Sequence, residues 1–133
     1  MAIPGSCLCR AIRYEIDELA SPIGFCHCQT CQKAHAAAAA PTARVHRKNF
    51  RWLAGREFVK GYESSPGKIR QFCSQCGSHI VASRDGQDEV ILRVATLDAD
   101  PVLRPVIHIW TSHQVPWLVD SNMLMAPEGV PLR

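Results

Sequence analysis

Cysteines are the residues of this chain whose types and spacing could do chemistry. Seven thiols fall into three tight groups, which are Cys7 and Cys9, then Cys26, Cys28 and Cys31, then Cys73 and Cys76. A disulfide framework takes an even number of cysteines at more scattered positions, in a chain that carries an export signal. In a reducing compartment, clustered thiols are usually metal ligands. We therefore expect the cysteines to bind metal.

The first and last cysteine groups together provide four thiolates. Residues i and i+2 of an extended segment point to the same face, so Cys7 and Cys9 are expected to present their thiols together as the chain enters its first strand. Cys73 and Cys76 have the two-residue gap of a zinc knuckle, and Gly77 follows where a tight turn needs a positive φ. Four thiolates from two distant segments would close a tetrahedral site and clamp the long segment between them, which stabilises a small β domain.

The central group has a different composition, with three thiols within six residues. Three protein ligands and one open position make a reactive zinc site, whereas four protein ligands make a closed one. Zinc held by three thiolates has a formal charge of about −1 and is a weak Lewis acid. It suits an incoming thiol, which loses its proton in the field of the metal and stays nucleophilic. The chemistry expected here is the attack of sulfur on carbon.

The spacing of the cysteines leaves other assignments open. The thiols could form disulfides, or some of them could be buried apolar residues. Four could bind a single zinc ion while the other three are redox-active or incidental. A swapped division, in which Cys7 and Cys9 join the central group, also agrees with the spacing.

The elements that must position these groups indicate a mostly β fold. Short segments rich in β-branched or aromatic residues are bounded by turn residues, and we expect strands over 11–16, 50–53, 57–62, 68–72, 79–83, 89–94 and 106–110. Turns are expected at 64–67 and at Asp85-Gly86, between apolar runs. The segment 33–40 has strong local helix propensity, which conflicts with this pattern. From Ser112 onward the chain looks irregular, and we expect it to pack over the body through Trp117, Met123 and Met125.

Length and composition indicate one soluble domain that spans residues 1–133. A chain of 133 residues with 47% hydrophobic residues has room for one compact core. The longest bland stretch ends at Pro41, so no run approaches the roughly 18 apolar residues of a membrane span. The N-terminus has neither the basic start nor the apolar run of a secretory signal, and we expect a cytoplasmic protein. A formal charge of +3 with few aromatics gives little reason to expect nucleic acid.

Taken together, these motifs resemble the glutathione-dependent formaldehyde-activating family, whose members share the zinc-bearing Mss4-like fold. The resemblance covers almost the whole chain and is carried by residues 5–9 with 11–14, 26–33 (CHCQTCQK), 72–78 (FCSQCGS), 95–98, 105–110 and 116–117. It implies short antiparallel sheets clamped by zinc, two Zn²⁺ ions, and a strand over 33–40. It also implies that a structural zinc is bound by Cys7, Cys9, Cys73 and Cys76. The second, catalytic zinc would be bound by Cys26, Cys28 and Cys31.

Two positions depart from the family pattern. Arg10 follows Cys9 where the family usually has Gly, and Gln32-Lys33 replaces the basic pair that commonly follows the third central cysteine. Neither position is a metal ligand. Because the fold implies a zinc site more firmly than it implies formaldehyde, these departures weaken any claim to a particular substrate.

Histidines and a basic stretch are the other candidate functional residues. In an extended strand His27 would point away from the metal, whereas a helical segment would turn His35 toward the side of Cys31 as a fourth ligand. His79 and His108 lie in strand-like runs and are expected to be satisfied structural histidines. A basic stretch is either a solvated face or an attraction for an acidic thiol such as glutathione, and it comprises Arg44, His46, Arg47, Lys48, Arg51 and Arg56.

The function that the sequence favours is that of a zinc-dependent carbon–sulfur lyase or synthase. A small thiol would bind the open position of the central zinc and add reversibly to an aldehyde, and the family suggests glutathione and formaldehyde as the pair. Two alternatives remain: a non-catalytic zinc module that binds a thiol or a partner protein, and a redox or metal sensor that uses the three-cysteine cluster. The sequence does not identify the oligomeric state.

Overall fold

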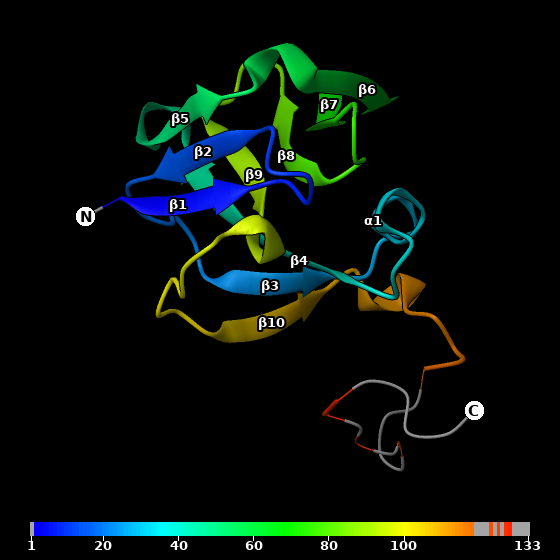
Figure 1. The fold of residues 1–133 in the computed structure, drawn as a ribbon. Coiled ribbons are helices and arrows are strands. Elements are labelled where there is room, and N and C mark those ends of the chain that lie inside the picture. The colour runs from blue at the N-terminus through cyan, green and yellow to red at the C-terminus, as the bar shows by residue number, and fades with distance from the viewer. Residues whose placement is uncertain (1, 119–122, 124, 126, 129–133) are drawn as a thin grey trace.

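Most of the chain is built from short β-strands (Figure 1). The computed structural model describes residues 2–118, 123, 125 and 127–128. Within these residues the elements are β1 (Ile3–Ser6), β2 (Arg13–Ile16), β3 (Ile23–Cys26), α1 (Gln29–His35), β4 (Ala40–His46), β5 (Phe50–Ala54), β6 (Val59–Ser65), β7 (Lys68–Cys73), β8 (His79–Arg84), β9 (Glu89–Arg93) and β10 (Pro105–Ile109). Single turns of 3₁₀ helix lie at Arg47–Asn49, Arg56–Phe58, Val94–Thr96 and Thr111–His113. The expected mostly β fold is confirmed.

Two sheets organise these strands. The larger has seven strands in the order β10-β3-β4-β9-β8-β7-β6, and the smaller has three in the order β1-β2-β5. Neighbouring strands are antiparallel, as expected, except that β10 pairs in parallel with β3. Through this parallel pair, residues near the C-terminal end of the described chain lie beside the strand that leads into the central cysteines.

The hydrophobic core lies between the two sheets. Ile12, Tyr14 and Ile16 from the region of β2 pack in one buried cluster with Val45 of β4 and Leu92 of β9. Alternate residues of a strand point to opposite faces, so each sheet gives one apolar face to this layer.

Both expected hairpin turns are present. Gly67, between β6 and β7, has φ 77°, and Gly86, between β8 and β9, has φ 76°. Glycine adopts this left-handed region without the steric cost that a Cβ atom imposes. These turns fix the register of the four strands β6 to β9, which form an antiparallel meander.

The strand that the resemblance implied over residues 33–40 is not formed. Residues Gln29–His35 are helix α1, and β4 begins only at Ala40. The helix begins after Cys28, whose Sγ accepts a hydrogen bond of 3.3 Å from the backbone N–H of Cys31, and it ends at Ala36 with φ 51°. Local helix propensity therefore prevails, because a cysteine of the motif caps the first turn.

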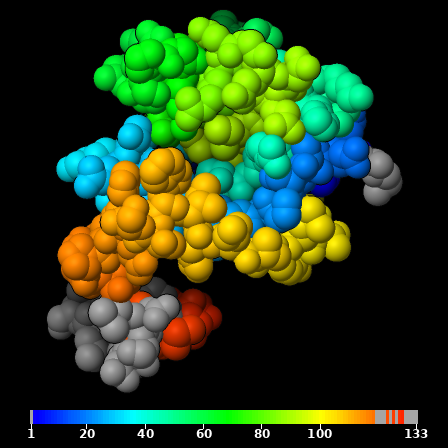
Figure 2. All heavy atoms as spheres, turned by 180° about the vertical axis from the view of Figure 1, so that it is seen from behind, coloured from blue at the N-terminus to red at the C-terminus, as the bar shows by residue number. Residues whose placement is uncertain are grey.

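The expected packing of the tail over the body is also wrong for the residues that can be placed. Trp117 is 70% exposed, Met123 54% and Met125 87%. Figure 2 shows the end of the described chain, in orange and red, extending from the body. The remainder of the predicted tail lies outside the described residues. In the described part of the chain, helices long and apolar enough to cross a membrane are absent.

Candidate metal centres

The first candidate centre joins two turns that are far apart in the sequence. Cys7 and Cys9 follow β1, whereas Cys73 ends β7 and Cys76 lies in the turn before β8. All four Sγ atoms lie within 4.8 Å of one another, with 3.6 Å between Cys7 and Cys9 and 3.8 Å between Cys9 and Cys73. A tetrahedron of sulfurs at a zinc–sulfur distance of about 2.3 Å has edges of about 3.8 Å. This donor set fits a closed four-thiolate metal site.

Backbone conformation, rather than an extended strand, brings Cys7 and Cys9 together. The chain turns after β1, and the N–H of Arg10 donates to the carbonyl of Cys7 at 3.0 Å. Arg10 has φ 66°, so it occupies the left-handed region that favours glycine. The expected extended segment at this point is wrong. The expected positive φ at Gly77 is confirmed, with φ 81° and a hydrogen bond of 2.8 Å to the Cys73 carbonyl.

Hydrogen-bond donors surround the four sulfur atoms of this centre. Backbone N–H groups of Ile12 and Gln75 donate to the Sγ atoms of Cys7 and Cys73 at 3.3 and 3.4 Å. Ser78 Oγ lies 3.3 Å from Cys76 Sγ and accepts from the N–H of Leu8 at 3.0 Å, which links the two turns. Hydrogen bonds of this kind favour the thiolate form that binds metal.

The second candidate centre lies in the loop between β3 and α1. Cys26 is the last residue of β3, Cys28 caps the helix and Cys31 lies in its first turn. Their three Sγ atoms lie within 4.8 Å of one another. Cys26 and Cys31 are buried and Cys28 is half-buried, so one side of the cluster is the more accessible. Each of the two cysteine clusters could therefore hold a metal ion.

Two buried arginines lie close enough to the three-cysteine cluster to act on its charge. Arg70 of β7 is only 2% exposed, and both of its terminal nitrogens lie 3.9 Å from Cys31 Sγ. Arg93, the last residue of β9, is 5% exposed. Among the ion pairs of the described residues, none joins either arginine to a carboxylate. Since a buried cation is costly without a counter-charge, thiolates of the cluster are the natural partners of these guanidinium groups.

The electrostatics of the cluster follow from these contacts. The pKa of Cys31 is lowered to about 4, first by the hydrogen bond from Cys26 and then by Cys28 and the positive charges of Arg93 and Arg70. The pKa of Cys26 is raised, because Cys26 shares its proton with the Cys31 thiolate and is buried. At least one thiolate is thus stabilised before any metal binds.

Neither arginine could be singled out from the sequence. Arg70 lies 39 positions from Cys31, and only the order of strands in the large sheet brings them together. The sequence shows only that each arginine lies in a short strand-like segment with apolar residues. Which face of the sheet its side chain points to depends on the strand pairing.

The histidines lie outside both cysteine clusters. His27 is buried, and its Nε2 lies 2.9 Å from Nδ1 of His108. The ring of His35 lies 4.8 Å, between centroids, from that of His79. His108 therefore has the partner expected of a structural histidine. His79 differs, since its Nδ1 is buried without a hydrogen-bond partner among the described residues.

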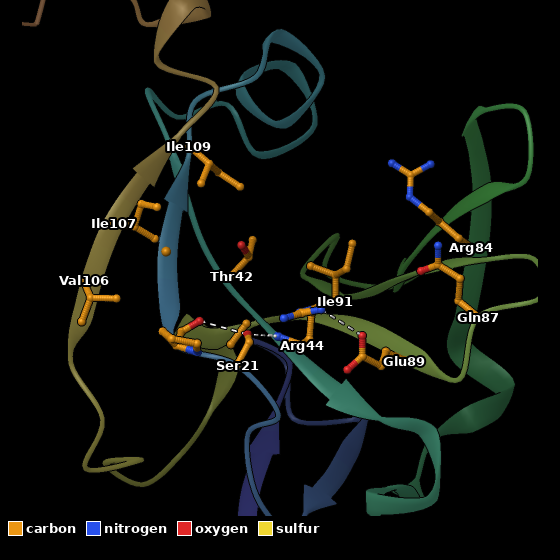
Figure 3. A pocket seen from close by; sticks show the side chains of 13 residues that line it. Ser21, Thr42, Arg44, Arg84, Gln87, Glu89, Ile91, Val106, Ile107 and Ile109 are labelled. Atoms are coloured by element: carbon orange, nitrogen blue, oxygen red, sulfur yellow. Dashed lines mark hydrogen bonds and ion pairs between the residues drawn. The ribbon is translucent and has the colours of Figure 1, made fainter.

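A cavity of about 560 Å³ is lined by residues of β3, β4, β9 and β10, among others (Figure 3). Its lining residues Gly24 and Thr42 are paired across β3 and β4, and Cys26 and Ala40 are paired two residues further along. Cys26 is therefore on the same face of the large sheet as the cavity. The side chains of Ile107 and Ile109 point into the cavity from β10. At its other end Arg44 pairs with Glu89 at 3.3 Å.

The basic stretch is spread over several elements. Arg44 lines the large cavity, whereas Arg51 on β5 pairs with Glu15 and Asp17 at 3.1 and 2.6 Å. Arg47 donates to the backbone carbonyl of Gln87 at 2.7 Å. Most of this stretch is thus exposed to solvent, three of its six residues form ion pairs, and Arg44 is its member at the large cavity.

The fold and the two cysteine clusters define a small β protein with two candidate metal centres. A family model described as "Glutathione-dependent formaldehyde-activating enzyme" matches residues 2–113, and the chain belongs to this family. A crystal structure of a Rhodobacter sphaeroides protein, a structural genomics target, is similar with a TM-score of 0.64 and 24% identity, and the match covers 77% of this chain and 98% of that one. At that identity the likeness supports the fold alone. A search of the curated proteins finds no match.

Proposed function

We propose that this protein is a zinc-dependent carbon–sulfur lyase that adds a small thiol reversibly to an aldehyde. Sulfur forms a bond to the carbonyl carbon, the C=O π bond breaks, and the thiol proton ends on the new hydroxyl oxygen. Family membership supports glutathione and formaldehyde as the substrates. Cys26, Cys28 and Cys31 would hold the catalytic zinc. The structural zinc would be held by Cys7, Cys9, Cys73 and Cys76.

The observation that carries this proposal is the pair of buried guanidinium groups beside three thiols. Zinc with three thiolates has a formal charge of about −1, and a fourth thiolate would bring the total to about −2. Arg70 and Arg93 together supply two positive charges within the same buried region. The surroundings thus favour an anionic fourth ligand over a neutral one, as a thiol-binding centre requires.

When bound, zinc would supply a position at which the substrate sulfur is held as a reactive thiolate. The chain's own residues would control access to the cluster and hold the substrate. Cys28 keeps the cluster accessible from one side, while the burial of Cys26 and Cys31 keeps water from the other. The cavity of about 560 Å³ on this face is large enough to receive the body of the thiol.

The decisive measurement is the rate of adduct exchange at equilibrium. Glutathione and formaldehyde combine spontaneously, so the zinc-loaded protein must accelerate exchange between free and adduct forms, measured by NMR exchange spectroscopy. Mere sequestration of thiol gives no acceleration. Cys28→Ser should abolish the acceleration, whereas Arg104→Gln, at an exposed arginine paired with Asp100, should keep it. Thiol binding without acceleration would favour a non-catalytic zinc module, and no binding of any small thiol would favour a sensor.

A further inference from the structure

A second, smaller cavity adjoins the three-cysteine cluster, and three of its lining residues have buried polar atoms without a hydrogen-bond partner. Its volume is about 240 Å³, and its wall includes Ala40, which packs directly against Cys26 and Cys31. Five buried side-chain nitrogens of the described residues have no hydrogen-bond partner, and four of these belong to residues of this wall: His35 Nε2, His79 Nδ1, Arg93 Nε and Arg93 Nη2. Such a concentration needs an explanation, because buried polar groups are normally paired.

Arg93 is the key residue of this cavity. The residue is only 5% exposed, and its buried Nε and Nη2 atoms both lack a hydrogen-bond partner among the described residues. These two nitrogens form one edge of the guanidinium plane, with two parallel N–H groups. That edge matches the two oxygens of a carboxylate in a bidentate pair. By contrast, Arg44 at the large cavity already pairs with Glu89 (Figure 3).

The two histidines of the wall do not add charge. Burial, followed by the positive charge of Arg93, lowers the pKa of His35 to about 3. Burial and Arg93 also lower the pKa of His79. Both rings are therefore neutral near pH 7, and each has one buried nitrogen that lacks a partner among the described residues and can act as a donor or an acceptor.

We propose that this cavity binds a carboxylate, held by the Nε and Nη2 edge of Arg93 with His35 and His79 beside it. A monoanion fits the local charge better than a phosphate dianion, because Arg93 is the one cation of the wall and the cysteine thiolates lie close by. The volume admits an acid group with a few further atoms but not a whole tripeptide.

This inference rests on the proposed function where it assigns the carboxylate to a substrate. Since the cavity adjoins the cysteines, the carboxylate belongs either to the thiol or to the aldehyde, and either source would orient the reacting group toward the cluster. Affinity would then exceed that of a simple carboxylate, because two groups bind at once.

Binding of acetate to the zinc-loaded protein tests the site without any catalysis. Saturation-transfer NMR should give a dissociation constant that Arg93→Lys raises about tenfold or more, because lysine keeps the charge and loses the two-pronged contact. Arg104→Gln, at an exposed arginine paired with Asp100, should leave the constant within about twofold. Acetate binding no tighter than that of chloride, or unaffected by Arg93→Lys, would overturn the site.

A second pair of variants tests the site independently, in case Arg93→Lys does not fold. Ala95 lines the cavity and is exposed, so Ala95→Leu narrows the opening without touching Arg93. Acetate binding should weaken at least fivefold in Ala95→Leu and stay unchanged in Ala95→Ser. Equal binding by both variants would contradict the assignment.

Two further ligands distinguish the source of the carboxylate. Mercaptoacetate compared with ethanethiol tests a carboxylate on the thiol, and glyoxylate compared with formaldehyde tests one on the aldehyde. Whichever of mercaptoacetate and glyoxylate resembles the natural substrate should bind at least tenfold more tightly than acetate. In Arg93→Lys its affinity should fall to that of acetate. Arg93-dependent acetate binding with no gain from either group would keep the carboxylate site and overturn its link to the thiol–aldehyde reaction. Failure of the exchange experiment alone would leave this result intact.

Discussion

The Sγ atoms of Cys9 and Cys73 lie 3.8 Å apart, although 64 positions separate them in the sequence. Cys9 lies in the turn that joins two strands of the small sheet, and Cys73 ends a strand of the large one. A metal ion at this point would therefore tie the two sheets together at one end of their shared core. The three-cysteine cluster has no such role, because its members lie within six consecutive residues, from the end of β3 to the first turn of α1.

Mutation of the two cysteine clusters should have opposite effects on folding. Cys73→Ser should abolish soluble expression or lower the melting temperature sharply, because a structural zinc contributes on the order of 10 kcal/mol to the folding of a small domain. Cys28→Ser should leave a folded protein with one zinc. Circular dichroism with elemental analysis checks both. A stable Cys73→Ser protein beside an unfolded Cys28→Ser protein would reverse the assignment.

Metal content should be close to two zinc ions per chain in protein purified under reducing conditions. Each cluster has enough thiols to hold one ion, and the sulfurs of each lie within 4.8 Å of one another. Elemental analysis with an independent protein determination gives the ratio. One zinc per chain would leave the three-cysteine cluster without its proposed metal.

The two ions should differ in lability. A closed four-thiolate site releases metal on unfolding, whereas a site with three protein ligands exchanges more readily. Mild chelation should therefore remove about half of the zinc while the circular dichroism spectrum is retained. Loss of all metal together with the structure would contradict this difference.

Removal of the buried charge of Arg70 should weaken metal binding at the three-cysteine cluster. Arg70→Met keeps much of the side-chain volume but leaves the thiolates with Arg93 alone as a buried cation beside them, and we expect zinc affinity there to fall about tenfold or more. Chelator competition measures the affinity. Arg84→Met, at an exposed arginine of the adjacent strand, is the matched control and should bind zinc like the original protein. Equal affinity in all three proteins would remove the charge-balance argument.

Arg10→Gly should stabilise the protein. Arg10 has φ 66°, where glycine avoids the cost of a Cβ atom, and the gain should be about 0.5 to 1 kcal/mol after the added flexibility of the unfolded chain. Arg13→Gly, at an exposed position of β2, should instead destabilise by a similar amount because it weakens a strand. Urea unfolding of the three proteins checks both signs, and a destabilised Arg10→Gly protein would show that the arginine side chain has a structural role.

The sequence by itself determined the mostly β fold, the hairpin turns at Gly67 and Gly86, and the composition of the cysteine groups. These features depend on local residue types and short spacings. Cysteines two or three residues apart meet in almost any compact turn, so their grouping could be predicted even though Cys7 and Cys9 lie in a turn rather than in a strand. Helix α1 was a local feature too, but its cap is a cysteine, which is an unusual capping residue.

Only the tertiary structure decided what surrounds the three-cysteine cluster. Arg70 and Arg93 belong to strands whose neighbours in the large sheet come from distant parts of the chain, and a shift of one residue in register would turn both side chains to the other face. The cavity beside Arg93 likewise requires α1, β8 and β9 to be in place together. Residue spacing along the chain does not predict these contacts, because they depend on long-range strand pairing and on the burial that follows from it.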